Sequence, residues 1–490
     1  MRTRLSLVII FCCLPFILWG VCGILPTFDD YTSLQSPWQI QIADPGYFFS
    51  DAVRRPFDYL LGCIVGYFPS LFPTLNHVLI ILGHTASTML LFAICRQLNI
   101  GMTATNIATL FFFFSPATLG ATLACDGFNQ TYAQLWGLLA LWLYLKPSSI
   151  IHYPLLSIAC VVMAALSKES GLAWAIVPPL VAYGFRLIER RQALRHVGVG
   201  LLIALAYFVV YATIYYSGIL GIEYDEQYTQ ATWQSHLRDI LQLMAYTWVP
   251  VDYVSLVYPP SRNWTIVIVT FLLSLPFLLL LFSQWRQLTK RRLTVLILCF
   301  FIVASPHLVT LISIMHNYAA LSIAALIVAT LLPSPFSLHP SPSTLHPSPS
   351  TLQHSKFLFF FFLAAAIFTD LHHYLAARQS GLLGKQLAMQ VIQNTETPPL
   401  SAFCINIDDD AEPRYSNFCV RPVDSFAWGL SVRHYSHYQW KTAITEATLP
   451  HYDQQQIEEL ADSALNSGCD AVWVVGHDHK RLTIIHHEQK

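Results

Sequence analysis

The sequence predicts an all-α polytopic membrane protein with about ten or eleven transmembrane helices and a small C-terminal α/β domain. Of its 490 residues, 54% are hydrophobic and 11% are charged, whereas soluble domains carry about 25% charged residues. The apolar residues also gather in runs, and about 20 helical residues are enough to cross the apolar core of a bilayer. The net charge of −1 gives no indication of a nucleic-acid partner.

The hydrophobic runs give a series of candidate spans, several of them short. The first run is interpreted as an uncleaved span, because no small-x-small cleavage site precedes the acidic residues that follow it. The candidate spans are residues 5–25, 75–95, 103–120, 131–145, 151–167, 170–185, 198–220, 264–283, 293–314, 318–333 and 357–371. Residues 1–333 therefore form a multi-span domain, with a long first outer loop at residues 27–74.

Lysine and arginine are distributed unevenly between the two sides of this predicted domain. With the N-terminus inside, the outer loops hold Arg54, Arg55, Lys168, Arg238 and Arg262. The inner loops hold a larger set: Arg96, Lys146, Arg186, Arg190, Arg191, Arg195, Arg286, Lys290, Arg291 and Arg292. Because cytoplasmic loops carry the excess of positive charge, we expect the outer loops on the extracytoplasmic face.

Two adjacent carboxylates follow the first span, in the stretch Phe28-Asp29-Asp30-Tyr31. A charged side chain costs roughly 2.5–3.5 kcal/mol at the centre of a membrane helix. The pair is therefore expected just outside the membrane, where it could act on a substrate whose tail stays in the lipid. The alternative is that Asp29 and Asp30 only end the helix and face water, and position alone does not decide between the two.

Basic residues of the outer loops are candidates for binding a phosphate. Arg54 and Arg55 are expected within reach of lipid phosphates, which arginine binds through a planar bidentate fork. Simple anchoring at the interface is the alternative for these arginines. Lys168 is on the outside against the charge bias and is flanked by apolar sequence, so it needs a partner such as Glu169 or a substrate phosphate.

A further acid, Asp126, lies in the outer loop between the third and fourth spans. An aspartate before a glycine is also a common turn former, so Asp126 alone does not indicate chemistry. Together with the residues above, however, it means that three consecutive outer loops place acidic or basic groups at one depth of the membrane.

Short motifs in residues 1–200 follow one another in a recognisable order. They are Phe28-Asp29-Asp30, Arg55-Pro56-Phe57, Asn76-His77 with His84, Ser115-Pro116, and Ser167-Lys168-Glu169-Ser170-Gly171. In this order and spacing they resemble the GT-C superfamily of membrane glycosyltransferases, close to its protein O-mannosyltransferase and TMTC-like branch. Beyond residue 200 only the many-span layout agrees.

The resemblance implies a hexosyl- or pentosyltransferase that takes its sugar from a polyprenyl-phosphate donor on the extracytoplasmic face. It implies that Asp29 or Asp30 is the catalytic base and that Asp126 assists a metal or the acceptor. Glu169 is a second candidate for the same assisting role as Asp126. A divalent cation (Mg²⁺ or Mn²⁺) bound at Asp30 and Asp126 is a further option. The acceptor, whether glycan, lipid or protein, is not implied, because the helical repeats of the TMTC-like branch are missing from this chain.

The chemistry that the resemblance implies also fits the residue types. A sugar on a polyprenyl phosphate already has a good leaving group, so no strong general acid is required, unlike in glycoside hydrolysis. A carboxylate can deprotonate the acceptor hydroxyl. Arg54, Arg55, Lys168 or a divalent cation can stabilise the departing phosphate. The expected location is a bacterial inner membrane, with the site and the C-terminal domain extracytoplasmic.

The C-terminal third is expected to contain a linker, a last span and a soluble domain. Residues 334–356 are rich in Pro and Ser and repeat Leu-His-Pro-Ser-Pro-Ser-Thr, which is typical of an irregular linker. Residues 357–371 are interpreted as the last span, and residues 375–490 as a small α/β domain. Its expected elements are helices at 384–393 and 454–467 and strands at 401–407 and 471–475.

A transporter or flippase for lipid-linked sugars is the alternative function, since it would also be multi-pass and basic at the phosphate. Transporters place polar groups near the middle of the bilayer and are often built from internal repeats. Here the charges cluster in outer loops and no repeat is evident between the halves, so the sequence favours the enzyme.

Overall fold

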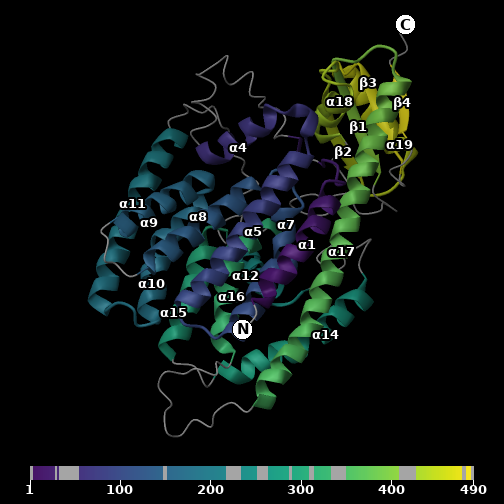
Figure 1. The fold of residues 1–490 in the computed structure, drawn as a ribbon. Helices are drawn as coiled ribbons and strands as arrows, with labels where there is room; N and C mark the ends of the chain where they lie inside the picture. The colour runs from purple at the N-terminus through teal and green to yellow at the C-terminus, as the bar shows by residue number, and fades with distance from the viewer. Residues whose placement is uncertain are drawn as a thin grey trace.

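The computed structural model describes residues 4–27, 30–31, 55–146, 152–216, 233–250, 263–285, 290–307, 314–332, 349–407, 426–476 and 482–486. Within these ranges the chain forms a large bundle of helices, and a small sheet with its own helices lies at one end of the bundle (Figure 1). The expected fold class, an all-α polytopic membrane protein with a small C-terminal α/β domain, is confirmed.

The bundle consists of α-helices joined by short 3₁₀ turns. Three of these turns are η2 (Pro69–Leu71), η3 (Pro116–Thr118) and η4 (Glu169–Ala175). The helices are α1 (Leu5–Val21), α4 (Pro56–Gly66), α5 (Thr74–Gln97), α6 (Met102–Phe113), α7 (Leu119–Thr122), α8 (Phe128–Tyr144), α9 (His152–Ser167), α10 (Val177–Gly184), α11 (Arg190–Tyr216), α12 (Trp233–Trp248), α14 (Trp264–Gln284), α15 (Lys290–Ala304), α16 (Asn317–Leu331) and α17 (Pro349–Asn394).

The helices differ in their ability to cross a bilayer alone. In the described part of the chain, α5, α11, α14 and α17 are long and apolar enough to do so. The expected span 103–120 is broken, since α6 and residues 116–122 meet at a bend of 45°. The expected span 170–185 consists of η4 and the eight-residue helix α10. Several expected spans are therefore shorter or more irregular than the hydrophobic pattern indicated.

The break after α6 is held together by a buried histidine. The Ala117 N–H, which the Phe113 carbonyl would use in a continuing helix, donates instead to the Ser115 hydroxyl. His84 Nε2 lies 3.1 Å from that carbonyl and His84 Nδ1 lies 2.8 Å from the Tyr318 hydroxyl. If Nε2 carries the proton, both contacts are satisfied, with Tyr318 donating to Nδ1. His84 thus links α5, α6 and α16.

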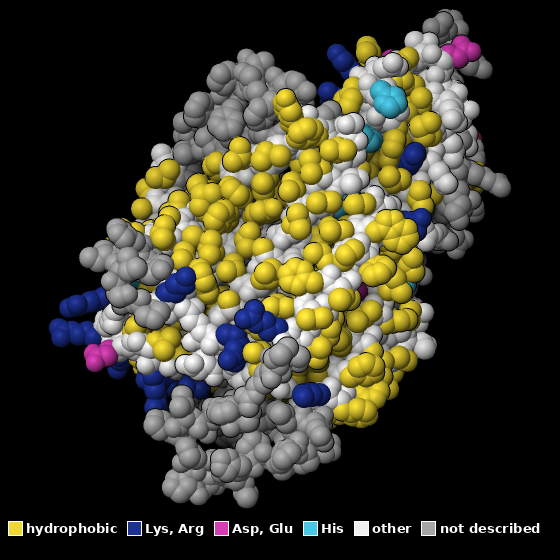
Figure 2. Space-filling model, in the orientation of Figure 1, with side chains coloured by type: hydrophobic (Ala, Val, Ile, Leu, Met, Phe, Trp, Pro, Cys, Tyr) yellow, Lys and Arg dark blue, Asp and Glu magenta, His cyan; other side chains and the backbone are white. Residues whose placement is uncertain are grey.

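The outer surface of the bundle is apolar. Figure 2 shows hydrophobic side chains over most of one face of the bundle, with Lys and Arg gathered at the end away from the sheet. Many large apolar side chains are exposed, among them Phe16 and Trp19 of α1 and Phe282 of α14. Such a surface suits contact with lipid, as expected for a multi-pass membrane protein.

Helix α17 differs from the expected division of the C-terminal third. Its 46 residues run from Pro349 to Asn394 without interruption. They therefore include the end of the expected linker 334–356, the expected last span 357–371 and the expected helix 384–393. The polar residues after 369 do not end the helix, because each still pairs its backbone along the helix axis. Residues 333–348 lie outside the described part.

The C-terminal domain is a four-stranded sheet with helices on both faces. The strands are β1 (Ser401–Ile407), β2 (Ala443–Leu449), β3 (Ala471–Val475) and β4 (Leu482–His486), in the order β2-β1-β3-β4. Strand β1 is parallel to β2 and β3, and β4 is antiparallel to β3. One face packs on α19 (Gln454–Asn466), and the other on the end of α17 and on α18 (Leu430–Tyr435). Strands β1 and β3 and helix α19 confirm the expected elements.

We predict that His84→Phe destabilises the bundle although the ring still packs against Phe112 and Phe113. The Phe113 carbonyl and the Tyr318 hydroxyl would be left unpaired, at roughly 1–3 kcal/mol each. Denaturation of the purified protein in detergent would measure the loss. Leu82→Ala, at an exposed position of the same helix, is the control and should cost less; equal losses would contradict the role of His84.

Candidate active site

Asp30 is a buried carboxylate with hydrogen bonds to both oxygens. Only 1% of the residue is exposed to solvent. Oδ2 accepts from the Thr27 backbone N–H (2.8 Å) and hydroxyl (3.2 Å), which closes a turn just after α1. Oδ1 accepts from the backbone N–H of Cys125, at 2.6 Å. The acid turn, defined here as residues 27, 30 and 31, is thereby fixed against the turn between α7 and α8.

The α7–α8 turn is held from several sides at Cys125. Besides the bond to Asp30, the Cys125 carbonyl accepts from Asn76 Nδ2 at 3.0 Å, and its Sγ lies 3.5 Å from His77 Nε2. Burial raises the pKa of the Cys125 thiol well above its ordinary value, and Asp30 adds to this. At Gly127 a Cβ would lie 1.9 Å from the Ala121 carbonyl oxygen, so only glycine fits this turn. The backbone that carries Asp126 is therefore rigidly placed.

A chain of polar contacts continues from Asp126 to Lys168. Asn129, in the first turn of α8, donates to the Asp126 carbonyl oxygen at 3.2 Å. Lys168, just before η4, is only 8% exposed, and its Nζ donates to Asn129 Oδ1 at 3.4 Å. The positive charge of Lys168 also acts on the neighbouring Glu169 carboxylate and helps to lower its pKa.

Arg55 and Glu169 form a bidentate ion pair between the start of α4 and η4. Arg55 Nε and Nη2 donate to the Glu169 carboxylate at 3.0 Å each. Burial raises the pKa of Glu169, but the charge and hydrogen bonds of Arg55 outweigh it and lower the pKa to about 2. Glu169 therefore stays ionised, and it occupies much of the hydrogen-bonding capacity of Arg55.

The structure thus brings together five of the residues singled out from the sequence: Asp30, Arg55, Asp126, Lys168 and Glu169. Asp29 and Arg54 lie outside the described residues. Among those described, no group of three or more His, Cys, Asp or Glu side chains is arranged to hold a metal ion. Three N–H and O–H donors already use most of the acceptor positions of the Asp30 carboxylate, which leaves little capacity for a metal ion.

No known family model and no curated protein sequence matches the chain. Among solved structures, it is similar to ArnT from Cupriavidus metallidurans in the apo state, with 13% identity, 97% of both chains covered and a TM-score of 0.51. ArnT from the same organism bound to undecaprenyl phosphate gives 13%, 98% of both chains and 0.50. The chain has the GT-C fold.

The GT-C likeness extends over nearly the whole chain, whereas the sequence motifs reached only to about residue 200. The structural similarity therefore includes the C-terminal domain. An oligosaccharyltransferase from Archaeoglobus fulgidus, tethered to an acceptor peptide, also matches, with 12% identity over 85% of this chain and 60% of that one. Its TM-score is 0.43, so this similarity is weaker than that to ArnT.

Several residues that build the candidate active site could not be singled out from the sequence. Cys125 contributes through its backbone N–H, which every non-proline residue has, and Asn129 is one polar residue at the start of an apolar helix. Tyr31 contacts Tyr435 of the C-terminal domain, 404 positions later. Only the position of Tyr31 directly after Asp30 could have drawn attention to it.

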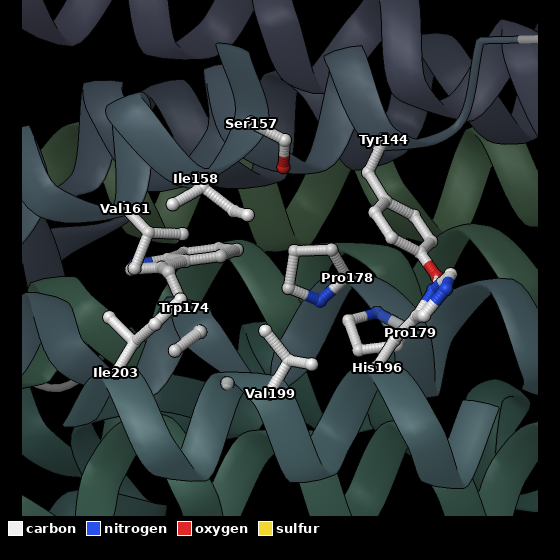
Figure 3. A pocket seen from close by; sticks show the side chains of 12 residues that line it. Tyr144, Ser157, Ile158, Val161, Trp174, Pro178, Pro179, His196, Val199 and Ile203 are labelled. Atoms are coloured by element: carbon white, nitrogen blue, oxygen red, sulfur yellow. Dashed lines mark hydrogen bonds between the residues drawn. The ribbon is translucent and has the colours of Figure 1, made fainter. Parts of the chain in front are cut away.

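A cavity of about 110 Å³ lies elsewhere in the bundle, between α8, α9, α10 and α11 (Figure 3). Trp174, Pro178 and Val199 form part of its mostly apolar wall, and a hydrogen-bonded pair, Tyr144 and His196, lies at one side. None of the charged residues described above lines it. It is therefore separate from the candidate active site.

We predict that Glu169 contributes to acid stability. Its pKa of about 2 in the folded protein is below the ordinary value of 4.5, so the unfolded state binds more protons and stability falls as pH drops through this interval. Melting curves at pH 6, 4 and 3 should show a smaller loss for Glu169→Gln than for the native protein. Glu458→Gln, an exposed glutamate in α19, is the control; a native-like loss in Glu169→Gln would contradict the prediction.

Proposed function

We propose that this protein is an integral membrane glycosyltransferase that moves a sugar from a polyprenyl-phosphate donor to an acceptor hydroxyl. The observation that carries the proposal is the acid turn, which a buried carboxylate fixes beside Asp126 and Lys168 at one end of a GT-C fold. ArnT, which shares the fold, has been crystallised with undecaprenyl phosphate. A lipid-linked donor would keep its tail in the bilayer and present its sugar to this end.

Asp29 is our candidate for the base that deprotonates the acceptor. Asp30 is less suited, because three hydrogen-bond donors stabilise its carboxylate and make it a weaker base. Adjacent residues point in different directions, so the two acids have different roles. Asp30 fixes the turn, and Asp29 precedes it directly in the chain. Asp126 assists the acceptor.

The donor phosphate is assigned to Lys168, with Arg55 and Arg54 as secondary groups. Lys168 is a buried ammonium group at this end of the fold, and a donor phosphate would place negative charge beside it. Stabilisation of the departing phosphate is worth most in such a water-poor site. Arg55 shares its guanidinium with Glu169, so its direct contribution is smaller than the sequence indicated. No step is assigned to a metal ion.

The candidate active site is assigned to the extracytoplasmic side of a bacterial inner membrane. Lys and Arg gather at the end of the bundle away from the sheet (Figure 2), and the positive-inside rule makes that end cytoplasmic. The acid turn and the C-terminal domain then lie outside. A transporter remains the alternative class, but no described feature favours it over the enzyme.

We predict that Asp29→Asn lowers kcat by about 10²–10⁴-fold, the usual range for general-base catalysis, while the KM for the donor changes little. Asp126→Asn should reduce activity less. Sugar transfer from radiolabelled polyprenyl-phosphate donors in membranes would measure both. Asp462→Asn, an exposed residue of α19, is the control. Native turnover in a folded Asp29→Asn protein would contradict the assignment of the base.

We predict that a cysteine at Ser70, exposed in η2, reacts with an impermeant thiol reagent only from the extracytoplasmic side. A cysteine at Glu189, exposed before α11, should react only from the cytoplasmic side, because it lies among inner basic residues. Labelling of intact and inverted vesicles would distinguish them. The reverse pattern would overturn the orientation.

A further inference from the structure

One face of α17 follows the segment that leads into the acid turn. Its hydroxyl-bearing Tyr374 donates to the Gly20 carbonyl at 3.2 Å, and Ala377 packs in one apolar cluster with Val21 and Ile24. These contacts and Gly381 are spaced at three and four residues, so they lie on one side of the helix. Figure 1 shows α17 (green) passing α1 (purple) on its way to the sheet.

Gly381 brings α17 into direct contact with the chain just before Thr27. A Cβ at this position would lie 2.5 Å from the Leu25 carbonyl oxygen and 2.9 Å from the Leu25 Cβ. Such distances are too short for a side chain, so any larger residue would push the two segments apart. Gly384, three residues later on the same helix, has no atom within 4 Å of the corresponding point.

Helix α18 contacts the acid turn itself. Tyr31, which follows Asp30, is 2% exposed and packs in a cluster with Ala427 and Tyr435. Its ring centroid lies 6.4 Å from that of Tyr435 and 5.9 Å from that of His434. The two tyrosine hydroxyls are 3.5 Å apart. Since this is long for a hydroxyl pair, ring packing is the main part of the contact.

The aromatic side chains of this contact are uncharged at neutral pH. Burial raises the pKa of Tyr31, and it raises the pKa of Tyr435 to about 12. Burial, with His437 and Lys385 nearby, lowers the pKa of His434 to about 4. Lys385 is the charged group at this contact, with its Nζ 5.8 Å from the centroid of the Tyr435 ring.

We infer that the C-terminal domain is a positioning element of the active site: Gly381 of α17 and Tyr435 of α18 hold the acid turn against Cys125. This inference rests on the proposed function for its catalytic meaning. The turn has two supports, the Asp30–Cys125 bond on the bundle side and α17 with α18 on the other. Loss of the second support would let the acids move relative to Asp126 and Lys168.

Gly381→Ala tests this inference, with Gly384→Ala as the matched control on the same helix. Gly381→Ala should lower kcat by roughly 10–100-fold, the effect of a displacement of about 1 Å in an active site, with an unchanged KM for the donor. Gly384→Ala should keep native kcat. Tyr435→Ala should lower kcat as Gly381→Ala does. When either substitution is combined with Asp30→Asn, the further fall in kcat should be smaller than in the native background, because all three residues act on one turn.

A second readout does not depend on activity. Cys125 is fully buried beneath Asp30, so its alkylation in the full-length protein, measured by mass spectrometry, reports on the position of the acid turn. Alkylation should be faster in Gly381→Ala and Tyr435→Ala than in Gly384→Ala, at equal melting temperature. Unchanged alkylation and kcat in both test variants would overturn the inference. If alkylation is faster in the two test variants but the native protein transfers no sugar, the contact is supported and the proposed function is refuted.

Discussion

The hydrogen bond from the Cys125 backbone N–H to the Asp30 carboxylate is the interaction on which the candidate site depends. A buried carboxylate is costly unless its lone pairs are satisfied, and here donors from two parts of the chain satisfy both oxygens. The acid turn therefore cannot move without also losing its contact with the α7–α8 turn. That constraint places the acid turn next to the chain segment that carries Asp126, and Asn129 links that segment to Lys168.

The membrane environment explains why irregular backbone occurs where it does. Backbone groups exposed to lipid must be paired internally, so the break between α6 and α7 and the 3₁₀ segment η4 are packed inside the bundle. His84 satisfies the carbonyl that the first break exposes. At η4, close contact needs glycine, since a Cβ at Gly137 would overlap Trp174. These irregular segments lead the chain to the polar end, where the proposed active site lies.

The sequence was sufficient for the fold class, because apolar runs and strand patterns are local properties. It also singled out Asp30, Asp126, Lys168 and Glu169, since charged residues next to spans are conspicuous. It did not predict the partners of Asp30 and Arg55. The Asp30–Cys125 bond joins residues 95 apart through a backbone group, and the Arg55–Glu169 pair joins residues 114 apart. The role inferred for α17 could not be predicted for a related reason. The close approach of Gly381 to Leu25 depends on the absence of a side chain, and it becomes visible only in the packing.

The most direct test of the account is to follow one lipid-linked donor through a single reaction in reconstituted vesicles. The donor would carry one label on its sugar and another on its polyprenyl chain, and the purified protein would be supplied with acceptors. A glycosyltransferase should release one polyprenyl phosphate for each sugar transferred, in proportion to the amount of protein. Movement of intact donor between leaflets, with both labels still joined, would contradict the account and indicate a transporter.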